Sequence, residues 1–144
     1  LKNLGRYITG SKVDMILCNP PYFKVDKQSN LNESQHYLLA RHEISTNLEE
    51  ICKIAQRVLK SNGRLAMVHR PERFLDILDT MQAHNLAPKR IQFVYPKLGK
   101  EANMLLIEAI KDGSLDGLKI LPPLFIHNQD GSYTPEIHEI YYGK

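Results

Sequence analysis

The chain has 144 residues, of which 42% are hydrophobic and 24% charged, as is ordinary for one globular domain with a core. No apolar run reaches the roughly 20 residues of a membrane-spanning helix, and no signal-peptide pattern is present, so we expect a cytoplasmic protein. Cys18 and Cys52 are isolated, and the six histidines lack metal-ligand spacing, which argues against disulfides and a metal site. The net charge of +3 is compatible with RNA binding but does not demonstrate it.

The first part of the chain predicts a strand, a polar loop and a helix. Residues 13–18 form an apolar run typical of a strand buried on both faces. Residues 23–44 are mostly polar and predict a loop beside the site, with a short helix near residues 33–39. Thr46-Asn47-Leu48-Glu49 is a capping box that opens a helix, and Asn62-Gly63 ends it.

The next part predicts a second strand, a helix and a third strand. Residues 64–69 form the strand, and Pro71 suits the first turn of the helix that follows. Pro88 separates this helix from the strand of residues 90–95. One face of the helix is an apolar stripe, made by Phe74, Ile77, Leu78 and Met81.

The last part predicts a hairpin, two short strands and a terminal helix. Residues 97–100 turn the chain into an apolar strand over residues 103–110. Residues 118–121 and 124–127 are short extended candidates. Thr134-Pro135-Glu136 is typical of an N-cap with proline at the first helical position, which starts a helix or turn that reaches Tyr142.

This order of elements predicts an α/β fold: the second half of a doubly wound sheet, mostly parallel with an antiparallel final hairpin. Ligands of open α/β sheets bind outside the carboxyl ends of the strands. Asn19 to Tyr22 follows one such end, and Arg70 follows another. We therefore expect a site at this edge.

Asn19-Pro20-Pro21-Tyr22 has a chemistry suited to a planar amine. The amine of adenine or of a glutamine amide is a poor nucleophile, because its lone pair is delocalised. The Asn19 amide oxygen and the Pro20 carbonyl can accept both N–H bonds, which favours a pyramidal nitrogen aimed at an electrophilic methyl group. Pro21 has no competing N–H, and the Tyr22 ring can stack on a flipped base. The alternative is an ordinary strand-to-loop turn.

Asn-Pro-Pro-Tyr after an apolar strand resembles the catalytic motif of S-adenosylmethionine-dependent amino-methyltransferases. Residues 19–23, 40–43, 121–124 and 130–136 together are similar to bacterial tRNA adenine-N6 methyltransferases, which modify the adenine 3′ of the anticodon in a valine tRNA. The resemblance extends over essentially the whole chain. It implies the class I methyltransferase (Rossmann-like) arrangement, with these strands as strands four to seven.

The resemblance also implies roles for individual residues, with S-adenosyl-L-methionine as cofactor and tRNA as substrate. The implied catalytic residues are Asn19, Pro20 and Tyr22, the implied substrate-binding residues are Pro21, Phe23, Arg41, His42 and Arg70, and the implied cofactor-binding residues are Asn19 and Cys18. Phe23 could equally be a core residue, and Arg41-His42-Glu43 an ion-paired helix end. We expect His69 to be a structural histidine. A basic face for phosphates could include Lys24, Lys27, Arg41, Arg70, Arg73, Lys89, Arg90, Lys97 and Lys100.

The chain departs from the family on the cofactor side. Its eight glycines are scattered singly and form no Gly-x-Gly turn, and no acidic residue ends a second strand. We therefore expect residues 1–144 to be the C-terminal, substrate-side part of one methyltransferase domain, inactive alone. The first strand, residues 13–18, would then have an open edge, through which two copies of the chain could pair as a homo-oligomer. The alternative functions are a protein glutamine N5-methyltransferase and an inactive fragment that only binds nucleic acid.

Overall fold

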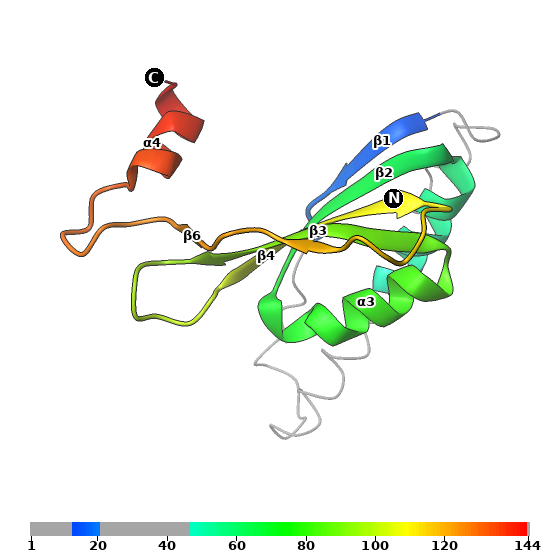
Figure 1. Cartoon of the computed structure of the whole chain (residues 1–144), viewed down its shortest axis with the longest axis horizontal. Helices are drawn as coiled ribbons and strands as arrows, with labels where there is room; N and C mark the ends of the chain where they lie inside the picture. Colours follow the sequence, from blue (N-terminus) through cyan, green and yellow to red (C-terminus); the bar gives the residue numbers. More distant parts are fainter. Residues whose placement is uncertain (1–12, 21–46, 144) are drawn as a thin grey trace, which may run out of the picture.

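The computed structural model describes residues 13–20 and 47–143, which form one mixed sheet with helices against one face (Figure 1). The order of the strands is β1-β2-β4-β3-β5, and β6 also pairs with β3. The strands are β1 (Val13–Cys18), β2 (Leu59–His69), β3 (Leu86–Tyr95), β4 (Met104–Lys111), β5 (Lys119–Ile120) and β6 (Leu124–Phe125). The helices are residues 47–58, the 3₁₀ turn η1 (Pro71–Arg73), α3 (Phe74–Ala83) and α4 (Pro135–Tyr142).

Strand directions confirm a mostly parallel sheet with an antiparallel hairpin. β1 pairs in parallel with β2, whereas β4 is antiparallel to both of its neighbours, β2 and β3. The short strands β5 and β6 run parallel to β3. The carboxyl ends of every strand except β4 therefore meet at one edge of the sheet.

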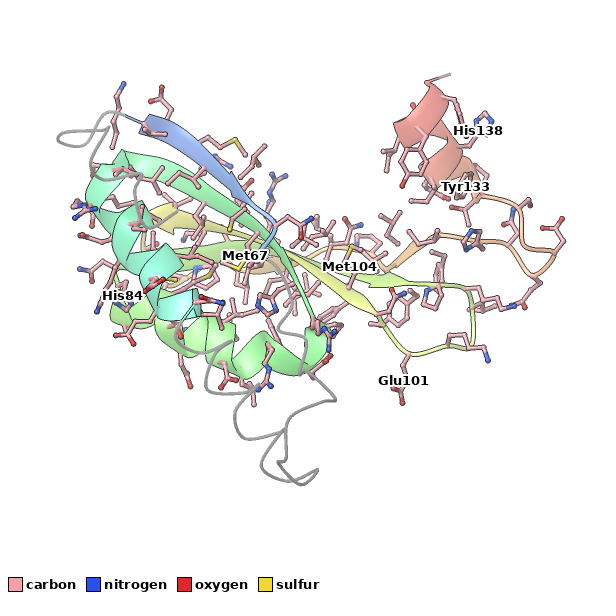
Figure 2. All side chains as sticks on the ribbon, turned by 180° about the vertical axis from the view of Figure 1, so that it is seen from behind. Met67, His84, Glu101, Met104, Tyr133 and His138 are labelled. Atoms are coloured by element: carbon pink, nitrogen blue, oxygen red, sulfur yellow. The ribbon has the colours of Figure 1, made fainter. Side chains whose placement is uncertain are left out.

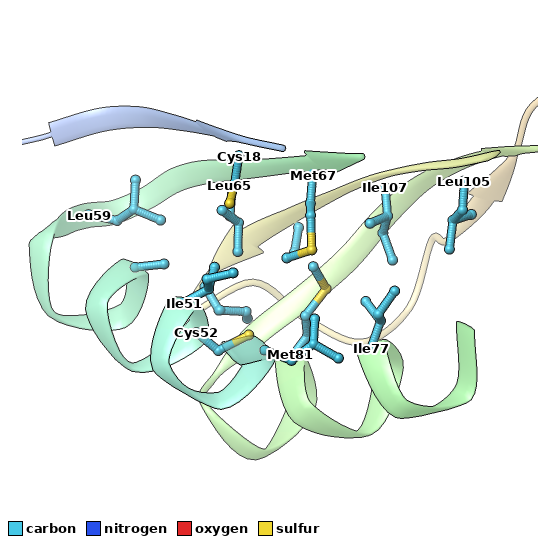
Figure 3. Packing of buried hydrophobic residues seen from close by; sticks show 14 of the residues in the cluster. Cys18, Ile51, Cys52, Leu59, Leu65, Met67, Ile77, Met81, Leu105 and Ile107 are labelled. Atoms are coloured by element: carbon cyan, nitrogen blue, oxygen red, sulfur yellow. The ribbon is translucent and has the colours of Figure 1, made fainter. Parts of the chain in front are cut away.

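The core lies between the sheet and the helices (Figure 3). Ile77 and Met81 of α3 are fully buried, and Phe74 meets Phe93 edge to face at a centroid distance of 5.4 Å. These contacts confirm the apolar stripe that the sequence predicted for the helix now labelled α3. Burial of each such aliphatic side chain stabilises the fold by roughly 1.5–3 kcal/mol.

The expectation that residues 13–18 would be buried on both faces is wrong. Leu17 is 76% exposed and Met15 47% exposed. The cause is position: β1 is the edge strand of the described sheet, and no described helix covers the face that Leu17 points to. Among the described strands, none pairs with the other edge of β1.

The first helix ends earlier than predicted, at residue 58, and β2 begins at Leu59. The pairing with β1 jumps from Leu59 to Arg64, so the residues between them form a bulge. Asn62 has a φ of 67°, and a Cβ on Gly63 would lie 2.8 Å from the carbonyl oxygen of Lys60. Asn62-Gly63 is therefore the turn of this bulge. The cap at Thr46 and the short helix near residues 33–39 lie outside the described residues.

The prediction that Pro88 separates α3 from β3 is wrong. Pro88 lies inside β3, opposite Ala109. The register shifts between Pro88 and Arg90, and a bulge is a position where a strand tolerates the missing N–H of proline. The bulged Lys89 extends its ammonium to the backbone carbonyls of Ser114 and Asp116, the latter at 2.6 Å.

The C-terminal part confirms the predicted terminal helix. The Thr134 hydroxyl accepts a hydrogen bond from the N–H of Ile137 (3.5 Å) and donates one to the carbonyl of Phe125 (2.6 Å). α4 lies away from the sheet, at the end of an extended segment that follows the β3–β4 hairpin (Figure 1). Within the described ranges, no helix is both long and apolar enough to span a membrane.

Candidate active site at the carboxyl edge of the sheet

Asn19 and Pro20 lie at the shared carboxyl edge, directly after β1. Cys18 pairs with Met67, so the two residues that follow β1 run beside the last residues of β2. Asn19 is exposed and Pro20 is buried. No hydrogen bond ties the Asn19 side chain to any other described residue, so its amide oxygen is available to a ligand. The predicted position after β1 is confirmed for Asn19 and Pro20 alone, while Pro21, Tyr22, Phe23, Arg41 and His42 lie outside the described residues.

Asn19 stands at the rim of a cavity of about 560 Å³ on the uncovered face of the sheet. Its walls are mostly apolar, with Arg90, Gln92 and Glu108 as polar groups. The complete lining is Leu17, Cys18, Asn19, Ala66, Met67, Val68, Arg90, Ile91, Gln92, Leu106, Ile107, Glu108 and Leu121.

Glu108 joins two arginines across this face. Its carboxylate accepts from Arg64 Nη1 at 2.6 Å and from Arg90 Nη2 at 2.8 Å. The bonds from Arg90 and then Arg64 hold the pKa of Glu108 below its usual value, against an opposing effect of burial. This cluster was not predicted, although an acidic residue inside the apolar run of residues 104–110 is a signal that could have indicated it.

His69 is the last residue of β2, and Arg70 follows it as the cap of η1. His69 is 3% exposed, and its Nδ1 accepts the backbone N–H of Arg70 at 2.8 Å, which places the proton of the neutral ring on Nε2. Burial, followed by the charges of Arg73 and Arg70, lowers the pKa of His69. The prediction of a structural histidine is confirmed. The Arg70 side chain is half exposed and lies 3.7 Å from the Glu72 carboxylate.

The predicted basic face is only partly assembled in the described residues. Arg73 is mostly buried and pairs with Asp76 at 3.4 Å, and Arg90 is held by Glu108. Lys89 is bound to the 114–116 loop. Lys97 and Lys100 lie together at the tip of the β3–β4 hairpin, beyond the carboxyl edge. Lys24, Lys27 and Arg41 lie outside the described residues.

The two thiols are poor nucleophiles. Burial raises the pKa of Cys18, and burial together with the nearby Cys18 raises the pKa of Cys52 to about 12. Both are free and buried, as predicted for small apolar residues. Among the described residues, no group of three His, Cys, Asp or Glu side chains is arranged to hold a metal ion.

Comparison with known proteins relates the chain to methyltransferases. The tRNA1(Val) (adenine(37)-N6)-methyltransferase of Porphyromonas gingivalis W83 is 30% identical over 135 residues, which are 93% of this chain and 52% of that protein. The protein of the same name from Aeromonas hydrophila is 30% identical over 84% of this chain and 49% of its own length. Over most of its length, the chain is a homologue of these methyltransferases. It spans about half the length of the curated relatives it matches. No protein-family model matches the chain.

Solved methyltransferase structures share the fold. A predicted O-methyltransferase, Atu636 from Agrobacterium tumefaciens, superposes with a TM-score of 0.70 at 21% identity, covering 93% of this chain and 53% of that one. A putative DNA modification methylase from Thermus thermophilus, in complex with S-adenosyl-L-methionine, superposes with a TM-score of 0.54 at 16% identity, covering 78% of this chain and 53% of that one. The mixed α/β sheet described above is therefore a methyltransferase sheet, as the sequence predicted.

Proposed function

We propose that the chain is the substrate-side half of an S-adenosylmethionine-dependent methyltransferase that modifies the exocyclic N6 amine of an adenine in the anticodon loop of a tRNA. The observation that carries this proposal is the position of Asn19-Pro20 at the carboxyl edge, with a free amide, in a homologue of the curated tRNA enzymes. Two observations support the proposal that the chain is one half of the enzyme: the half-length match to those relatives, and an edge of β1 that pairs with no other described strand.

In this proposal Asn19 and Pro20 act on the amine. The Asn19 Oδ1 accepts one N–H bond and the carbonyl of Pro20 accepts the other, so the nitrogen lone pair is free to attack. Tyr22 stacks on the flipped base, with Pro21 and Phe23 beside it. Arg41, His42 and Arg70 hold the surrounding RNA. The amine loses a proton to water after methylation, so no general base is required, which agrees with a His69 committed to the Arg70 N–H.

The described residues fit the cofactor only on the side of the reacting amine. Cys18 and Asn19 would line the methionine end of S-adenosylmethionine, which supplies an electrophilic methyl group when bound. The glycines of this chain do not form the turn that meets the carboxylate of such a cofactor. The contacts to its adenosine and carboxylate then belong to the other half of the enzyme.

Two further proposals concern the setting of the protein. A tRNA substrate places the enzyme in the cytoplasm. The open edge of β1, with the exposed Leu17 beside it, would pair with the remaining half of the enzyme, or with a second copy when this chain is alone.

The substitution Asn19→Ala in the full-length enzyme tests the proposed chemistry. The lost acceptor acts on the developing transition state, so we expect kcat to fall by the equivalent of about 2–4 kcal/mol, with little change in the Kd for tRNA. Steady-state methyl transfer and a tRNA binding assay measure the two effects.

The control for substrate class is the same assay with a release factor in place of tRNA. Methylation of a glutamine side chain in the release factor and none of tRNA would overturn the proposed substrate. Near wild-type turnover of the alanine variant would make Asn19 an ordinary turn residue.

A further inference from the structure

An exposed row of aromatic rings lies on the C-terminal segment. We call the rings of His127, Tyr133, Tyr141, Tyr142 and His138 the aromatic row, because each meets the next at centroid distances of 5.3, 5.5, 6.3 and 4.9 Å. Tyr133, Tyr141 and Tyr142 are 41%, 65% and 68% exposed. Rings of this size bury large areas in cores and interfaces, so a contiguous exposed set indicates a binding surface.

The row is held in place before any ligand arrives. His127 and Tyr133 form a β-bridge, and their rings stack at an interplanar angle of 15°. Tyr141 and Tyr142 belong to α4, which Thr134 caps and whose Ile137 is buried, at 4% exposed. Ring surfaces fixed in this way lose little conformational entropy on binding.

The position of the row follows from the sheet. β3 and β6 end at the same edge as β1, so the residues after Phe125 extend beyond the edge at which Asn19 lies. Figure 2 shows Tyr133 and His138 at the far end of this extension, away from Met67 in the core. A large RNA substrate with one base at Asn19 can therefore contact the row with another of its nucleotides.

The hairpin tip adds positive charge next to the row. The N–H of His127 donates to the carbonyl of Pro96 (2.9 Å), and the Gln129 side chain donates to the carbonyl of Leu98 (3.1 Å). Lys97 and Lys100 belong to this tip. The acidic Glu101, at the same tip, and Asp130, Glu136 and Glu139 outnumber them, so a contact here depends on stacking more than on phosphate charge.

We propose that the aromatic row stacks on an unpaired base of the substrate RNA, outside the adenine that is methylated. This inference rests on the proposed function. Sequence-tolerant stacking of unpaired bases on aromatic rings is a common mode of RNA binding, and loops and ends offer such bases. Tyr141 is 65% exposed and contacts both Tyr133 and Tyr142, so its loss would interrupt the row at the centre.

The test compares Tyr141→Ala, Tyr141→Phe and the matched control Ile140→Ala in the full-length enzyme. Ile140 is 66% exposed on the same helix and is not one of the rings of the aromatic row. Fluorescence anisotropy with a labelled anticodon stem-loop gives the Kd. We expect Tyr141→Ala to raise the Kd about tenfold, and the other two variants to stay within about twofold of wild type. The dependence of log Kd on log salt should not change.

Three outcomes would overturn the inference. An unchanged Kd for Tyr141→Ala, in an enzyme that still methylates tRNA, removes the row from RNA binding while the proposed function stands. A change in sedimentation coefficient without a change in Kd makes the row a protein–protein contact. A wild-type enzyme that transfers no methyl group to tRNA defeats the proposed function, and the RNA contact with it.

Discussion

Glu108 holds two guanidinium groups on a sheet face that is otherwise largely apolar. Its side chain is mostly buried, whereas those of Arg64 and Arg90 are half exposed. Loss of the carboxylate would leave two arginines without their shared acceptor, next to the cavity at Asn19. The cluster therefore contributes to the shape of this face as well as to stability.

We predict that Glu108→Gln destabilises the protein in a pH-dependent way. The lowered pKa of Glu108 means that the folded state stabilises the ionised carboxylate more than the unfolded state does. That stability is present above the unfolded pKa of about 4.3 and is lost as the pH falls through the lower folded pKa. At pH 7 we expect the free energy of unfolding to fall by about 1–2 kcal/mol. The loss is no larger because both arginines are half exposed to solvent.

Urea unfolding at pH 7 and at pH 3.5 measures the difference. Glu101→Gln is the control, because Glu101 is exposed at the hairpin tip and makes no ion pair with another described residue. A loss of stability that is equal at both pH values would assign the effect of Glu108→Gln to packing instead of charge.

Among the elements, β2 contains a bulge near its start, at residues 60–63. We predict that Gly63→Ala destabilises the protein by about 1–3 kcal/mol, the scale of overpacking. The reason is space and not backbone conformation: the new Cβ would lie 2.8 Å from the Lys60 carbonyl oxygen and 3.2 Å from that of Asp14 in β1. The backbone of the bulge would have to shift away from the new Cβ, and Asp14 of β1 would have to move slightly.

The free energy of unfolding in urea checks this prediction. Ser61→Ala is the control in the same bulge, since its hydroxyl makes only an exposed hydrogen bond to Asp112. A Gly63→Ala protein as stable as wild type would mean that the bulge shifts at no cost, which would contradict this prediction.

The helix periodicity and the turn residues were enough to place most elements from the sequence. The α3 stripe and the capped α4 are local patterns, and both are confirmed. The bulges at residues 60–63 and at Lys89 could not be predicted, because each depends on a partner strand distant in the chain.

The candidate site shows the same division. Asn19 was found from a contiguous motif, whereas the Glu108 cluster brings together residues from the separate strands β2, β3 and β4. Contacts of this kind depend on sheet register, which composition and spacing do not specify.

At the scale of the whole molecule, the described sheet has helices on one face and a cavity on the other, and β1 leaves one edge unpaired. In an α/β fold with a mostly parallel sheet, both faces are normally covered. This asymmetry agrees with the half-length match to the curated relatives. It also places the exposed Leu17 and Met15 next to the proposed catalytic turn.

The last prediction is that this 144-residue chain alone binds S-adenosylmethionine weakly or not at all. It offers the amine side of the site, but neither a Gly-rich turn for the methionine carboxylate nor an acidic strand end for the ribose. The remaining contacts are too few to offset the loss of translational and rotational freedom on binding. Isothermal titration calorimetry of the purified chain measures the affinity, and sedimentation velocity reports whether the edge of β1 forms a dimer. Micromolar binding by a monomer would show that the described residues hold more of the cofactor site than its amine side, whereas the same affinity in a dimer alone would mean that a second copy replaces the missing half.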